Sequence, residues 1–512
     1  MSTITILVGT SVFLLIAWFL LKEFFVSSPL DNVPGPPSPS LIKGHMERLF
    51  HKNEGWKMHD ELGNKYSPVA RIKGFLGKRV LYVFDHVALQ SIILKDQQYY
   101  EESSFTISMN LLLFGPGVGS TLHDQHRKQR KMLIPAFSPK HLRDMTPLFY
   151  QVAEKLRDGI KKQIAEAPGE VDILNWMGRA ALELVGQAGL GYSFDPLVED
   201  SKNSFGDAIK ATFPNVVALG GMIVLGPYVS KLGPPALRRW LVNLLPSSKI
   251  QTLKSIVDLL DQRSREIIAE KRIAIQQGGE ALLQQVGEGH DAMSVLHTTS
   301  GALAQMLQLL SEHPEVQEKL REEIIQASCG QNIPYDQLET LPYLDAVCRE
   351  TLRMYPPATD VYREKDMILP LSEPIRGVDG TWIKEIPVPK DTRVIVSLRG
   401  CNRNKAIWGE DAEEWKPERW LAPLPHTLTD ARVPGIYTHL MTFLGGGRSC
   451  IGFKFSQLEM KAVLCVLLRD FKFTSTNKPI VWNISFVKYP TVGKGSSKPS
   501  LPLMVETLKN SS

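Results

Sequence analysis

One cysteine, Cys450, lies where a glycine-rich loop changes into a helical pattern. It follows the glycine run Gly445–Gly447 and precedes apolar residues that recur at helical spacing. Glycine allows backbone to approach a flat ligand, and the free N–H groups at a helix N-terminus favour a thiolate over a thiol. The pattern is therefore typical of a sulfur that binds a metal.

A phosphate site and an inert thiol are the two alternatives to a metal-bound sulfur at this loop. Glycine-rich turns before helices also bind phosphate, but the Walker spacing with its Lys-Ser/Thr is absent, and no strand-borne Gly-x-Gly-x-x-Gly precedes a suitable acid. A single cysteine is most often a buried, inert thiol. The residues around Cys450 argue against that state, because they fit the pattern Phe-x-x-Gly-x-Arg-x-Cys-x-Gly from Phe443 onward. Each residue type occurs at a given position with a frequency of roughly 5%, so these five fixed types match by chance in about one of several thousand chains.

This loop resembles the haem-binding loop of the cytochrome P450 family, which consists of haem-thiolate monooxygenases. The resemblance implies haem b (iron protoporphyrin IX) as the cofactor and Cys450 as the ligand of its iron. It further implies that Phe443 and Gly445 belong to the haem-binding loop and that Arg448 contacts a haem propionate. It also implies that one oxygen atom of O2 is inserted into a hydrophobic small molecule, with electrons from NADPH.

Two more segments support the resemblance. Glu350 and Arg353 are three residues apart and share one side of a helix, although such pairs often lie on solvated helix faces. A Pro-Glu-Arg-Trp sequence that contains Arg419 lies between this pair and the cysteine, in the family's order. The resemblance implies a buried ion network of Glu350, Arg353 and Arg419 with a structural role, and a propionate contact from Arg363.

A basic segment before position 131 matches a third motif of the family, with His126 in place of the family's tryptophan. His126 and Arg130 are therefore implied as propionate contacts. A solvated basic helix face is the alternative. Lys128, Lys131 and Lys454 indicate a docking surface for an acidic electron donor, which the resemblance identifies as NADPH-cytochrome P450 reductase.

The oxygen-activating helix of the family is matched only in part. Thr298 and Thr299 fit its motif and are the implied catalytic residues, with Thr298 helping to protonate bound oxygen. His297 stands where the family has an acid, and the bulky Val295 and Leu296 lie where the family has small residues. Because an ordinary histidine has a pKa of about 6.5, His297 is chemically suited to replace the acid as a proton relay.

The same helix is too short. A helix that crosses a domain of about 30–40 Å needs about 20–27 residues, whereas only a short stretch separates Gly287–Gly289 from Thr298. We expect that its N-terminal half is deleted between Leu296 and His297; a genuine variant with a His297 relay is the alternative. Two other functions stay open, a haem-binding or haem-free protein without catalysis and a haem-thiolate isomerase or dehydratase that needs no reductase.

The rest of the chain predicts a mainly α fold with small β-sheets, the cytochrome P450 fold, with residues 40–512 as one haem-binding monooxygenase domain. One predicted helix ends before Pro356, a second closes at Ser311–His313, and Pro314 opens a third. The predicted strands are Val80–Phe84, Arg393–Leu398 and Phe471–Ser475. The resemblance places the substrate pocket at Phe105–Gly119, Ala211–Leu232, Ala358–Val361 and Phe486–Val492.

The N-terminus predicts a membrane anchor. Ile4–Leu21 contains 18 residues without a charge, about the length that crosses a bilayer. Positive charges follow this run rather than precede it, which disfavours the alternative of a cleaved signal peptide and favours a cytosolic body. We expect a single-pass anchor at residues 1–24, a Pro-rich linker at 25–39, contact with membrane lipid, and location in the endoplasmic reticulum membrane.

Composition limits the remaining function classes. With 43% hydrophobic and 22% charged residues, the chain resembles packed globular proteins rather than disordered or multi-span membrane chains. Its net charge of +5 over 512 residues gives no argument for a nucleic-acid partner. The 5 cysteines include no Cys-x-x-Cys pair, so neither a disulfide framework nor a structural zinc site is expected.

Overall fold

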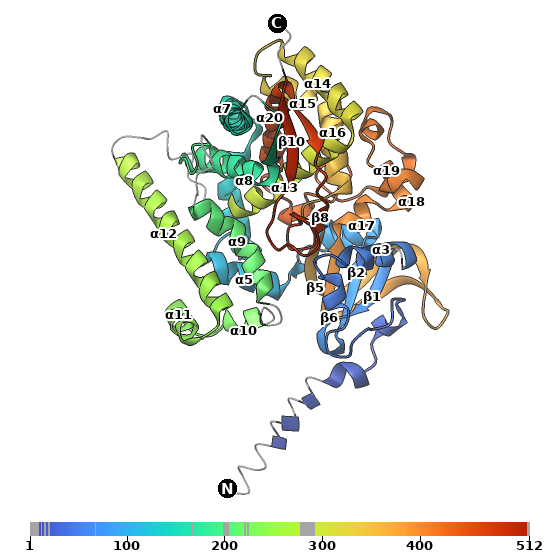
Figure 1. Ribbon diagram of the computed structural model, residues 1–512. Coiled ribbons are helices and arrows are strands. Elements are labelled where there is room, and N and C mark those ends of the chain that lie inside the picture. Colours follow the sequence, from blue (N-terminus) through green and yellow to red (C-terminus); the bar gives the residue numbers. More distant parts are fainter. Residues whose placement is uncertain are drawn as a thin grey trace. The chain divides into compact units, whose positions relative to one another are not determined.

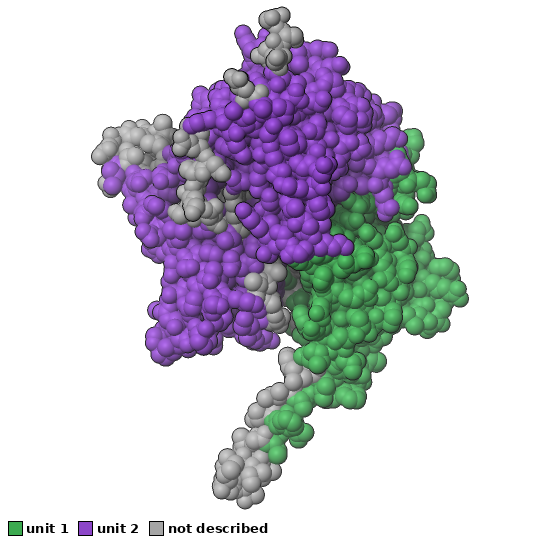
Figure 2. All heavy atoms as spheres, in the orientation of Figure 1, with its two compact units in different colours: residues 1–103, 360–412, 426–447 green, residues 104–359, 413–425, 448–512 purple. Residues whose placement is uncertain are grey.

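The computed structural model describes residues 10–508, except 12, 15, 16, 19, 20, 67, 166, 198–203, 220, 221, 223, 224 and 277–291. Contacts divide the chain into two compact units (Figure 2): unit 1 comprises residues 1–103, 360–412 and 426–447, and unit 2 comprises residues 104–359, 413–425 and 448–512. The chain passes from one unit to the other five times, and two of these points directly follow short Pro- or Gly-rich segments, Ala422–Pro425 and Gly445–Gly447. The single domain expected over residues 40–512 stays a prediction.

Unit 1 is built on a five-stranded sheet with the order β1-β2-β6-β5-β3 (Figure 1). Its strands are β1 (Val69–Lys73), β2 (Arg79–Val83), β3 (Glu101–Glu102), β5 (Asp360–Arg376) and β6 (Trp382–Ser397). β2 and β6 run parallel, and the other neighbours run antiparallel. The strand predicted at 80–84 is confirmed as β2 with a shift of one residue. The strand predicted at 393–398 covers only the end of β6, and Leu398 already begins a helix.

Short helices accompany this sheet: α2 (Met46–Leu49), α3 (Gly55–Lys65), α4 (His86–Gln90), α17 (Leu398–Asn402), α18 (Lys405–Trp408) and α19 (His426–Ala431). Asp85 caps α4 by accepting hydrogen bonds from the backbone N–H groups of Val87 and Ala88. The same buried carboxylate accepts from the backbone and hydroxyl of Ser372 in β5. One aspartate therefore joins the start of α4 to the sheet.

Unit 2 is mainly helical (Figure 1). Its helices are α5 (Ser104–Phe114), α6 (His123–Leu133), α7 (Pro139–Ile164), α8 (Ile173–Leu184), α9 (Ser204–Ala218), α10 (Gly226–Val229), α11 (Pro235–Leu244), α12 (Ser248–Gln276), α13 (Ala292–Glu312), α14 (Pro314–Ser328), α15 (Tyr335–Thr340), α16 (Pro342–Met354) and α20 (Phe453–Asp470). α20 is buried continuously from Phe455 to Leu468 and packs against α7 and α14. A helix buried on all sides is the centre of a core, and α20 is also the helix that follows Cys450.

The helix ends in unit 2 agree with the proline signals in the sequence. α13 ends at Glu312 and α14 begins at Pro314, while α16 ends at Met354, before Pro356. Proline lacks the N–H group that an interior helical position must donate, so it is tolerated in the first turn and excluded further along. These three predicted boundaries are confirmed.

Two small sheets complete unit 2. One has the order β4-β10-β7 and contains β4 (Gly169–Asp172), β10 (Pro502–Thr507) and β7 (Phe471–Ser475), the last as predicted. The other is the hairpin of β8 (Ile480–Asn483) and β9 (Tyr489–Val492). The fully buried Asn483 amide donates to the backbone oxygens of Val481 and Tyr489 and to the hydroxyl of Thr491, which holds the two strands together.

The predicted membrane anchor lies largely outside the described residues. Among the residues that are described, no helix has both the length and the apolar character that crossing a bilayer requires. The residues that follow the apolar run 4–21 contact Arg79 of β2. Arg79 donates to the carboxylates of Asp31 and Glu23 at 2.8 and 2.9 Å and to the backbone oxygen of Val26 at 2.7 Å. Hydrogen bonding to Arg79 lowers the pKa of Asp31 to about 2. The segment after the apolar run is thus tied to the sheet of unit 1.

Candidate functional site

Cys450 is an exposed thiol two residues after a short 3₁₀ turn, Gly446–Arg448, and three residues before α20 begins. The cap residue of α20 is Gly452, which has no side chain to accept from the first N–H groups. Backbone N–H groups at a helix start carry partial positive charge, which stabilises a thiolate. The described geometry therefore offers an accessible sulfur in a setting that favours its ligand form.

The glycines before Cys450 are needed for contacts within unit 1. A Cβ on Gly445 would lie 1.8 Å from the backbone oxygen of Pro434, and one on Gly446 would lie 2.2 Å from that of Ile93. Gly446 also has a φ of +63°, which disfavours other residue types. The sequence pattern suggested that these glycines admit a ligand, whereas the contacts seen are with protein backbone.

We predict that Gly445→Ala destabilises the protein by about 1–3 kcal/mol, because overpacking against rigid backbone forces the loop to move. Gly447→Ala is the matched control, since its added Cβ would meet only the flexible end of Gln97 at 3.2 Å. Melting temperature and haem bound per chain measure both variants. Equal losses in the two variants would contradict the assignment of backbone packing to Gly445.

Positive charge gathers beside Cys450. Arg130 of α6 donates to the backbone oxygen of Ser449 at 2.7 Å and to its hydroxyl at 3.0 Å. Arg448 donates to the backbone oxygen of Thr121 at 2.6 Å. Burial, followed by the charges of Arg448 and Arg130, lowers the pKa of His126 to about 4. Two guanidinium groups and a neutral imidazole therefore lie near one another next to the cysteine, where they favour an anionic ligand.

The structure brings Glu350, Arg353 and Arg419 together. Glu350 and Arg353 of α16 are completely buried and form two hydrogen bonds of 2.8 Å each. The Glu350 carboxylate also accepts from Arg419 at 3.4 Å, the Trp420 indole at 3.0 Å and the backbone N–H of Lys416 at 3.0 Å. The carboxylate thus connects α16 to the segment 416–420 within unit 2.

The predicted catalytic residues lie near the start of the described side chains of α13. The His297 ring nitrogen Nε2 lies 3.1 Å from the backbone oxygen of Ile209 in α9. Thr298 is half-buried, and Thr299 is 2% exposed with no hydrogen-bond partner for its hydroxyl in the part of the chain that the structure describes. The deletion expected before His297 concerns residues 287–296, of which 287–291 and the side chains of 292–296 lie outside the described part.

Besides Gly445, two predicted cofactor residues lie in unit 1. The Phe443 ring packs edge-on against Tyr437, with ring centroids 5.6 Å apart. Arg363 lies in β5, where its backbone is paired with Glu102 of β3 and Val394 of β6. Its side chain lies outside the described part of the chain, so its predicted propionate contact stays a prediction.

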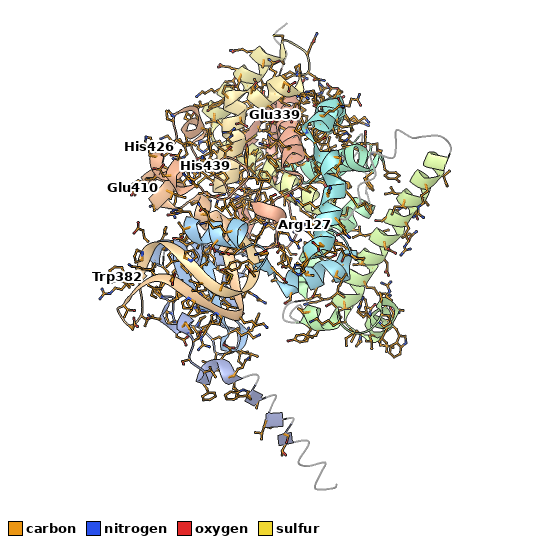
Figure 3. The ribbon with its side chains drawn as sticks, turned by 180° about the vertical axis from the view of Figure 1, so that it is seen from behind. Arg127, Glu339, Trp382, Glu410, His426 and His439 are labelled. Carbon is orange, nitrogen blue, oxygen red and sulfur yellow. The ribbon has the colours of Figure 1, made fainter. Side chains whose placement is uncertain are left out.

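The three lysines assigned to electron-donor docking differ in their surroundings. Lys128 and Lys131 of α6 are exposed, as is their neighbour Arg127 (Figure 3). Lys454 instead lies 3.2 Å from the carboxylate of Glu339, which is also labelled in Figure 3. The α6 lysines therefore offer more accessible positive charge than Lys454 does.

Three of the four predicted substrate-pocket segments come together in unit 2. The first is mostly helical, because Phe105–Phe114 lies within α5. Met109 and Leu113 of α5 form an apolar cluster with Val216 of α9. Phe105 stacks on Phe486, with ring centroids 6.4 Å apart and an interplanar angle of 13°. These contacts join α5, α9 and the β8–β9 loop through apolar side chains.

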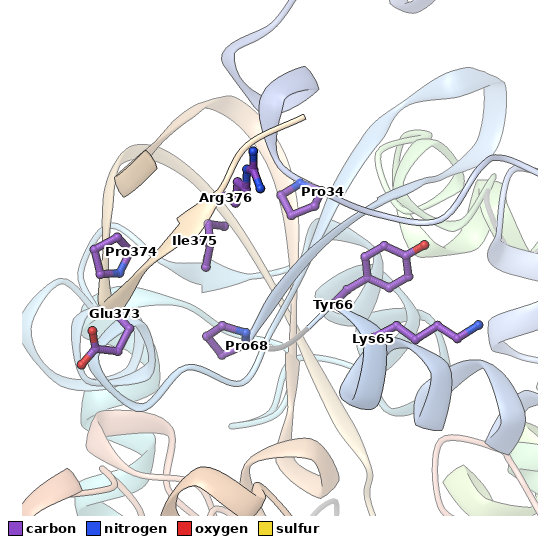
Figure 4. Close-up of a pocket in the computed structure, with 8 residues that line it drawn as sticks. All are labelled: Pro34, Lys65, Tyr66, Pro68, Glu373, Pro374, Ile375 and Arg376. Atoms are coloured by element: carbon purple, nitrogen blue, oxygen red, sulfur yellow. The ribbon is translucent and has the colours of Figure 1, made fainter. Parts of the chain in front are cut away.

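A separate hollow lies in unit 1 and contains none of the predicted site residues (Figure 4). Its cavity volume is about 440 Å³. It is lined by Pro34, Lys65, Tyr66, Pro68, Glu373, Pro374, Ile375 and Arg376. Nothing in its lining resembles the chemistry around Cys450.

Several buried ionisable side chains in unit 2 were not predicted from the sequence, and Glu459 and Lys488 are two of them. Glu459 lies in the middle of α20, and burial raises its pKa to about 8. Lys488 lies in the β8–β9 loop and is 4% exposed. A single acid within the apolar pattern of α20 is a sequence signal for a buried Glu459. The sequence contains no such signal for Lys488, because its contacts come from distant segments.

The residues around Cys450 fit a haem group. A porphyrin iron needs an accessible axial ligand, and the two carboxylates of haem b need cationic or hydrogen-bonding partners. Cys450 supplies the exposed sulfur, while Arg130, Arg448 and His126 supply the charge and the hydrogen-bonding group near it. The donor set therefore suits an iron porphyrin better than an isolated metal ion. In the described residues, no cluster of three or more His, Cys, Asp or Glu side chains is arranged to hold a metal ion.

Comparisons with known proteins show the family of this chain. A sequence model of the family described as Cytochrome P450 matches residues 34–492. Cytochrome P450 monooxygenase 91 of Postia placenta is 51% identical, with 97% of this chain and 98% of that protein covered. Cytochrome P450 monooxygenase 81 of the same fungus is 48% identical, with coverage of 96% and 95%. Ganoderic acid synthetase CYP5150L8 of Ganoderma lucidum is 45% identical, with coverage of 96% and 97%.

The protein is thus a haem-dependent oxidoreductase with the mainly helical fold of its class. The chain belongs to the cytochrome P450 family and is a cytochrome P450 monooxygenase. Membership implies haem as the cofactor and a small molecule as the substrate. The family and fold predicted from the Cys450 loop are confirmed.

Proposed function

We propose that this chain is a membrane-anchored haem-thiolate monooxygenase that oxidises a hydrophobic small molecule. The observation that carries the proposal is the accessible Cys450 thiol beside Arg130 and Arg448. In the overall reaction, O2, a C–H substrate, NADPH and one proton give the hydroxylated product, water and NADP⁺. The name of the Ganoderma lucidum relative, ganoderic acid synthetase, supports an oxygenated natural product as the outcome.

Each residue near the cysteine has a defined task in this proposal. Cys450 binds the iron, and Arg130, Arg448 and His126 hold the haem carboxylates. Haem bound through a thiolate supplies the chemistry that cleaves the O–O bond of dioxygen. Thr298 holds a hydroxyl that can pass a proton toward the site. Apolar residues of α5, α9 and the β8–β9 loop orient the substrate and exclude water.

NADPH-cytochrome P450 reductase is the proposed electron donor, and the exposed Lys128 and Lys131 support docking of an acidic protein. The endoplasmic reticulum membrane is the proposed location, with residues 22–512 on its cytosolic side. The uncharged run Ile4–Leu21 and the basic residues after it support that orientation. Arg79, Asp31 and Glu23 give this anchor a firm connection to unit 1.

A second candidate function is a catalytically impaired or haem-binding-only form that lacks part of the oxygen-activating helix. The match with the 51% identical relative runs over 531 residues, more than the 512 of this chain. That relative therefore carries residues without a counterpart in this chain, as a deletion would produce. Sequencing of transcripts tests this directly. An in-frame segment between Leu296 and His297 would assign full activity to a longer form.

The carbon monoxide difference spectrum of the reduced chain tests the proposed function. We expect a band at about 450 nm, which depends on a thiolate ligand, and its loss in Cys450→Ala. Cys329→Ala is the control, because Cys329 is the other exposed cysteine. Turnover of apolar substrates with NADPH and the reductase then separates the two candidate functions. The active monooxygenase gives oxygenated product, and the impaired or haem-binding-only form gives none. A wild-type chain with no band at this wavelength would contradict both the thiolate ligand and the monooxygenase assignment.

A further inference from the structure

The hollow in unit 1 (Figure 4) has rigid walls. Pro34, Pro68 and Pro374 line it together with Ile375. A proline ring is closed onto its own backbone, so it cannot turn into the space as a long side chain can. The cavity volume of about 440 Å³ lies within the range of small-molecule pockets. The hollow is therefore large enough for a small molecule, and the rings in its walls do not fill it.

The wall that contains Pro34 is fixed on two sides. The backbone oxygen of Pro34 accepts from the N–H group of Arg71 in β1 at 2.8 Å. Two residues earlier, the backbone oxygen of Asn32 accepts from Val378 at 2.8 Å, and its side-chain oxygen accepts from the N–H group of Asp379 at 3.0 Å. This segment thus joins β1 to the turn between β5 and β6, so the wall is formed before any ligand binds.

A second wall is formed by an irregular part of β5. Between the residue pairs Pro370–Glu385 and Ile375–Ile383, four residues of β5 lie opposite a single residue of β6. In a regular strand, successive side chains point to opposite faces of the sheet. Here the four consecutive residues Glu373–Arg376 all line the hollow. The extra residues of this bulge therefore turn the strand toward the hollow.

The bulge is held in place by a buried carboxylate. Ser372 lies within the bulge and donates from its backbone N–H group at 3.0 Å and from its hydroxyl to Asp85, which is 1% exposed. Bulges that re-aim side chains are common beside functional sites. Because this bulge is tied to the sheet, the backbone of its neighbours in the wall is held in place as well.

Charged side chains of both signs lie around the hollow. Lys65 at the end of α3 and Arg376 are cationic, Glu373 is anionic, and all three are exposed. In Figure 4, Glu373 and Lys65 lie on opposite sides of the hollow, and Arg376 lies beside Pro34. No ion pair joins any two of these three charges in the part of the chain that the structure describes. Opposite charges that are held apart complement a molecule that itself carries both charges.

The types of these residues favour a phosphate ester that also carries an ammonium group. A guanidinium such as that of Arg376 binds phosphate through two parallel N–H···O bonds, and Lys65 adds a second cation. Glu373 can accept from an ammonium group, and the ring face of Tyr66 attracts a cation. A simple phosphate ion would use only the two cations and would be repelled by Glu373. A ligand with both charges uses every charged residue of the lining.

We propose that the hollow of unit 1 binds a zwitterionic phosphate ester with an ammonium group, the chemistry of ethanolamine phosphate and choline phosphate esters. This chemistry occurs both in phospholipid headgroups and in free phosphate esters, and the site recognises the part that they share. None of its lining residues belongs to the predicted haem or substrate site. The proposal therefore does not rest on the proposed function.

Calorimetric titration of the full-length holoprotein tests the proposal. The protein is held in nanodiscs of phosphatidylglycerol, a lipid without an ammonium group, and the probe is glycerophosphoethanolamine. Glycerol 3-phosphate and ethanolamine are the two half-probes. We expect the Kd of the whole probe to be lower than that of either half by about tenfold. The absence of binding by the whole probe overturns the proposal, and so does equally tight binding of glycerol 3-phosphate.

Two variants locate the binding in the hollow. Arg376→Gln and Glu373→Gln should each raise the Kd of the whole probe by about tenfold, because each removes one charged partner. Lys384→Gln is the matched control, since Lys384 is an exposed cation of β6 outside the lining, and its Kd should stay at the wild-type value. An unchanged Kd in Arg376→Gln or in Glu373→Gln overturns the proposal.

Ser372→Ala tests the role of the bulge, because it keeps every charge of the lining and removes the hydroxyl that bonds to Asp85. It should raise the Kd by a smaller factor of about threefold. Melting temperatures of all variants are measured beside the titrations. Arg376 and Glu373 are exposed, so their variants should melt at the wild-type temperature, and their loss of binding then reports on the site itself.

The lipid of the nanodisc distinguishes the two sources of the ligand. If a bilayer headgroup fills the hollow, nanodiscs that contain phosphatidylethanolamine raise the apparent Kd of the free probe. An equal Kd in both kinds of nanodisc assigns the hollow to a free phosphate ester. Either result supports the ligand chemistry, provided that the Arg376→Gln and Glu373→Gln effects are present. The carbon monoxide difference spectrum is independent of all these titrations, so failure of this proposal and failure of the proposed function are distinguishable.

Discussion

Replacement of Glu350 by leucine is expected to lower the free energy of unfolding by about 3–5 kcal/mol, the cost of breaking a buried charged network by removing one partner. Glu350 is completely buried and accepts hydrogen bonds from Arg353, Arg419, Trp420 and the backbone of Lys416. Leucine leaves the buried Arg353 without its carboxylate. We therefore also expect the variant to contain much less haem per chain than wild type.

Asp336→Leu is the matched control for this prediction. Asp336 pairs with Arg143 at 2.6 Å in the same unit, but these side chains are 71% and 49% exposed. Exposed ion pairs contribute little to stability, because water and salt screen them. Denaturant midpoints followed by tryptophan fluorescence, together with the haem content, measure both variants. Similar losses for Glu350→Leu and Asp336→Leu would show that burial of the network does not govern its contribution.

Glu459→Gln is expected to stabilise the protein at neutral pH, by an amount that grows as the pH rises. Glu459 is completely buried, and neither carboxyl oxygen has a hydrogen-bond partner in the described part of the chain. Burial raises its pKa from 4.5 to about 8. The folded protein therefore holds the neutral acid at pH 7, whereas the unfolded chain ionises. Glutamine imitates the neutral form and has no charge to lose.

The direction of the pH effect follows from this raised pKa. The contribution of Glu459 to stability is fully present below its unfolded pKa and is lost as the pH rises toward 8. At about 1.4 kcal/mol per pH unit, the loss reaches about 3 kcal/mol at pH 7. Melting temperatures of wild type and Glu459→Gln should therefore nearly agree at pH 5 and diverge toward pH 8. A difference that is constant over this range would mean that Glu459 is ionised in the fold.

Local sequence signals predicted the helical half of the fold well because proline acts locally. Pro314 and Pro356 define helix ends in unit 2 without help from distant residues. The long β5–β6 hairpin was mostly missed, because prolines and charges interrupt its apolar alternation. Its register shifts between Pro370 and Ile375, a β-irregularity that accommodates the intervening proline. Such pairing is decided by the partner strand, which a single-sequence pattern does not contain.

The candidate site shows the same division between local and distant information. Cys450 and its spacing from Arg448 were readable as a motif. The motif does not explain why position 445 requires glycine, because that requirement comes from the nearby backbone oxygen of Pro434. Similarly, Glu350 and Arg353 were readable as a pair on one helix, whereas the Trp420 donor becomes evident only when the 416–420 segment packs against α16. Motifs predict which residues bind the haem, and tertiary contacts show what holds those residues in place.

The buried Asn483 affects how the proposed membrane orientation of this chain can be tested. Asn483 begins an Asn-Ile-Ser sequon, which is an acceptor for N-linked glycans in secretory compartments. Its amide is fully buried and bonded within the β8–β9 hairpin, so a glycan there would prevent the two strands from pairing. A folded chain is therefore unglycosylated at Asn483 in whichever compartment it lies. A glycosylation reporter of topology belongs at an exposed position such as Lys472 instead.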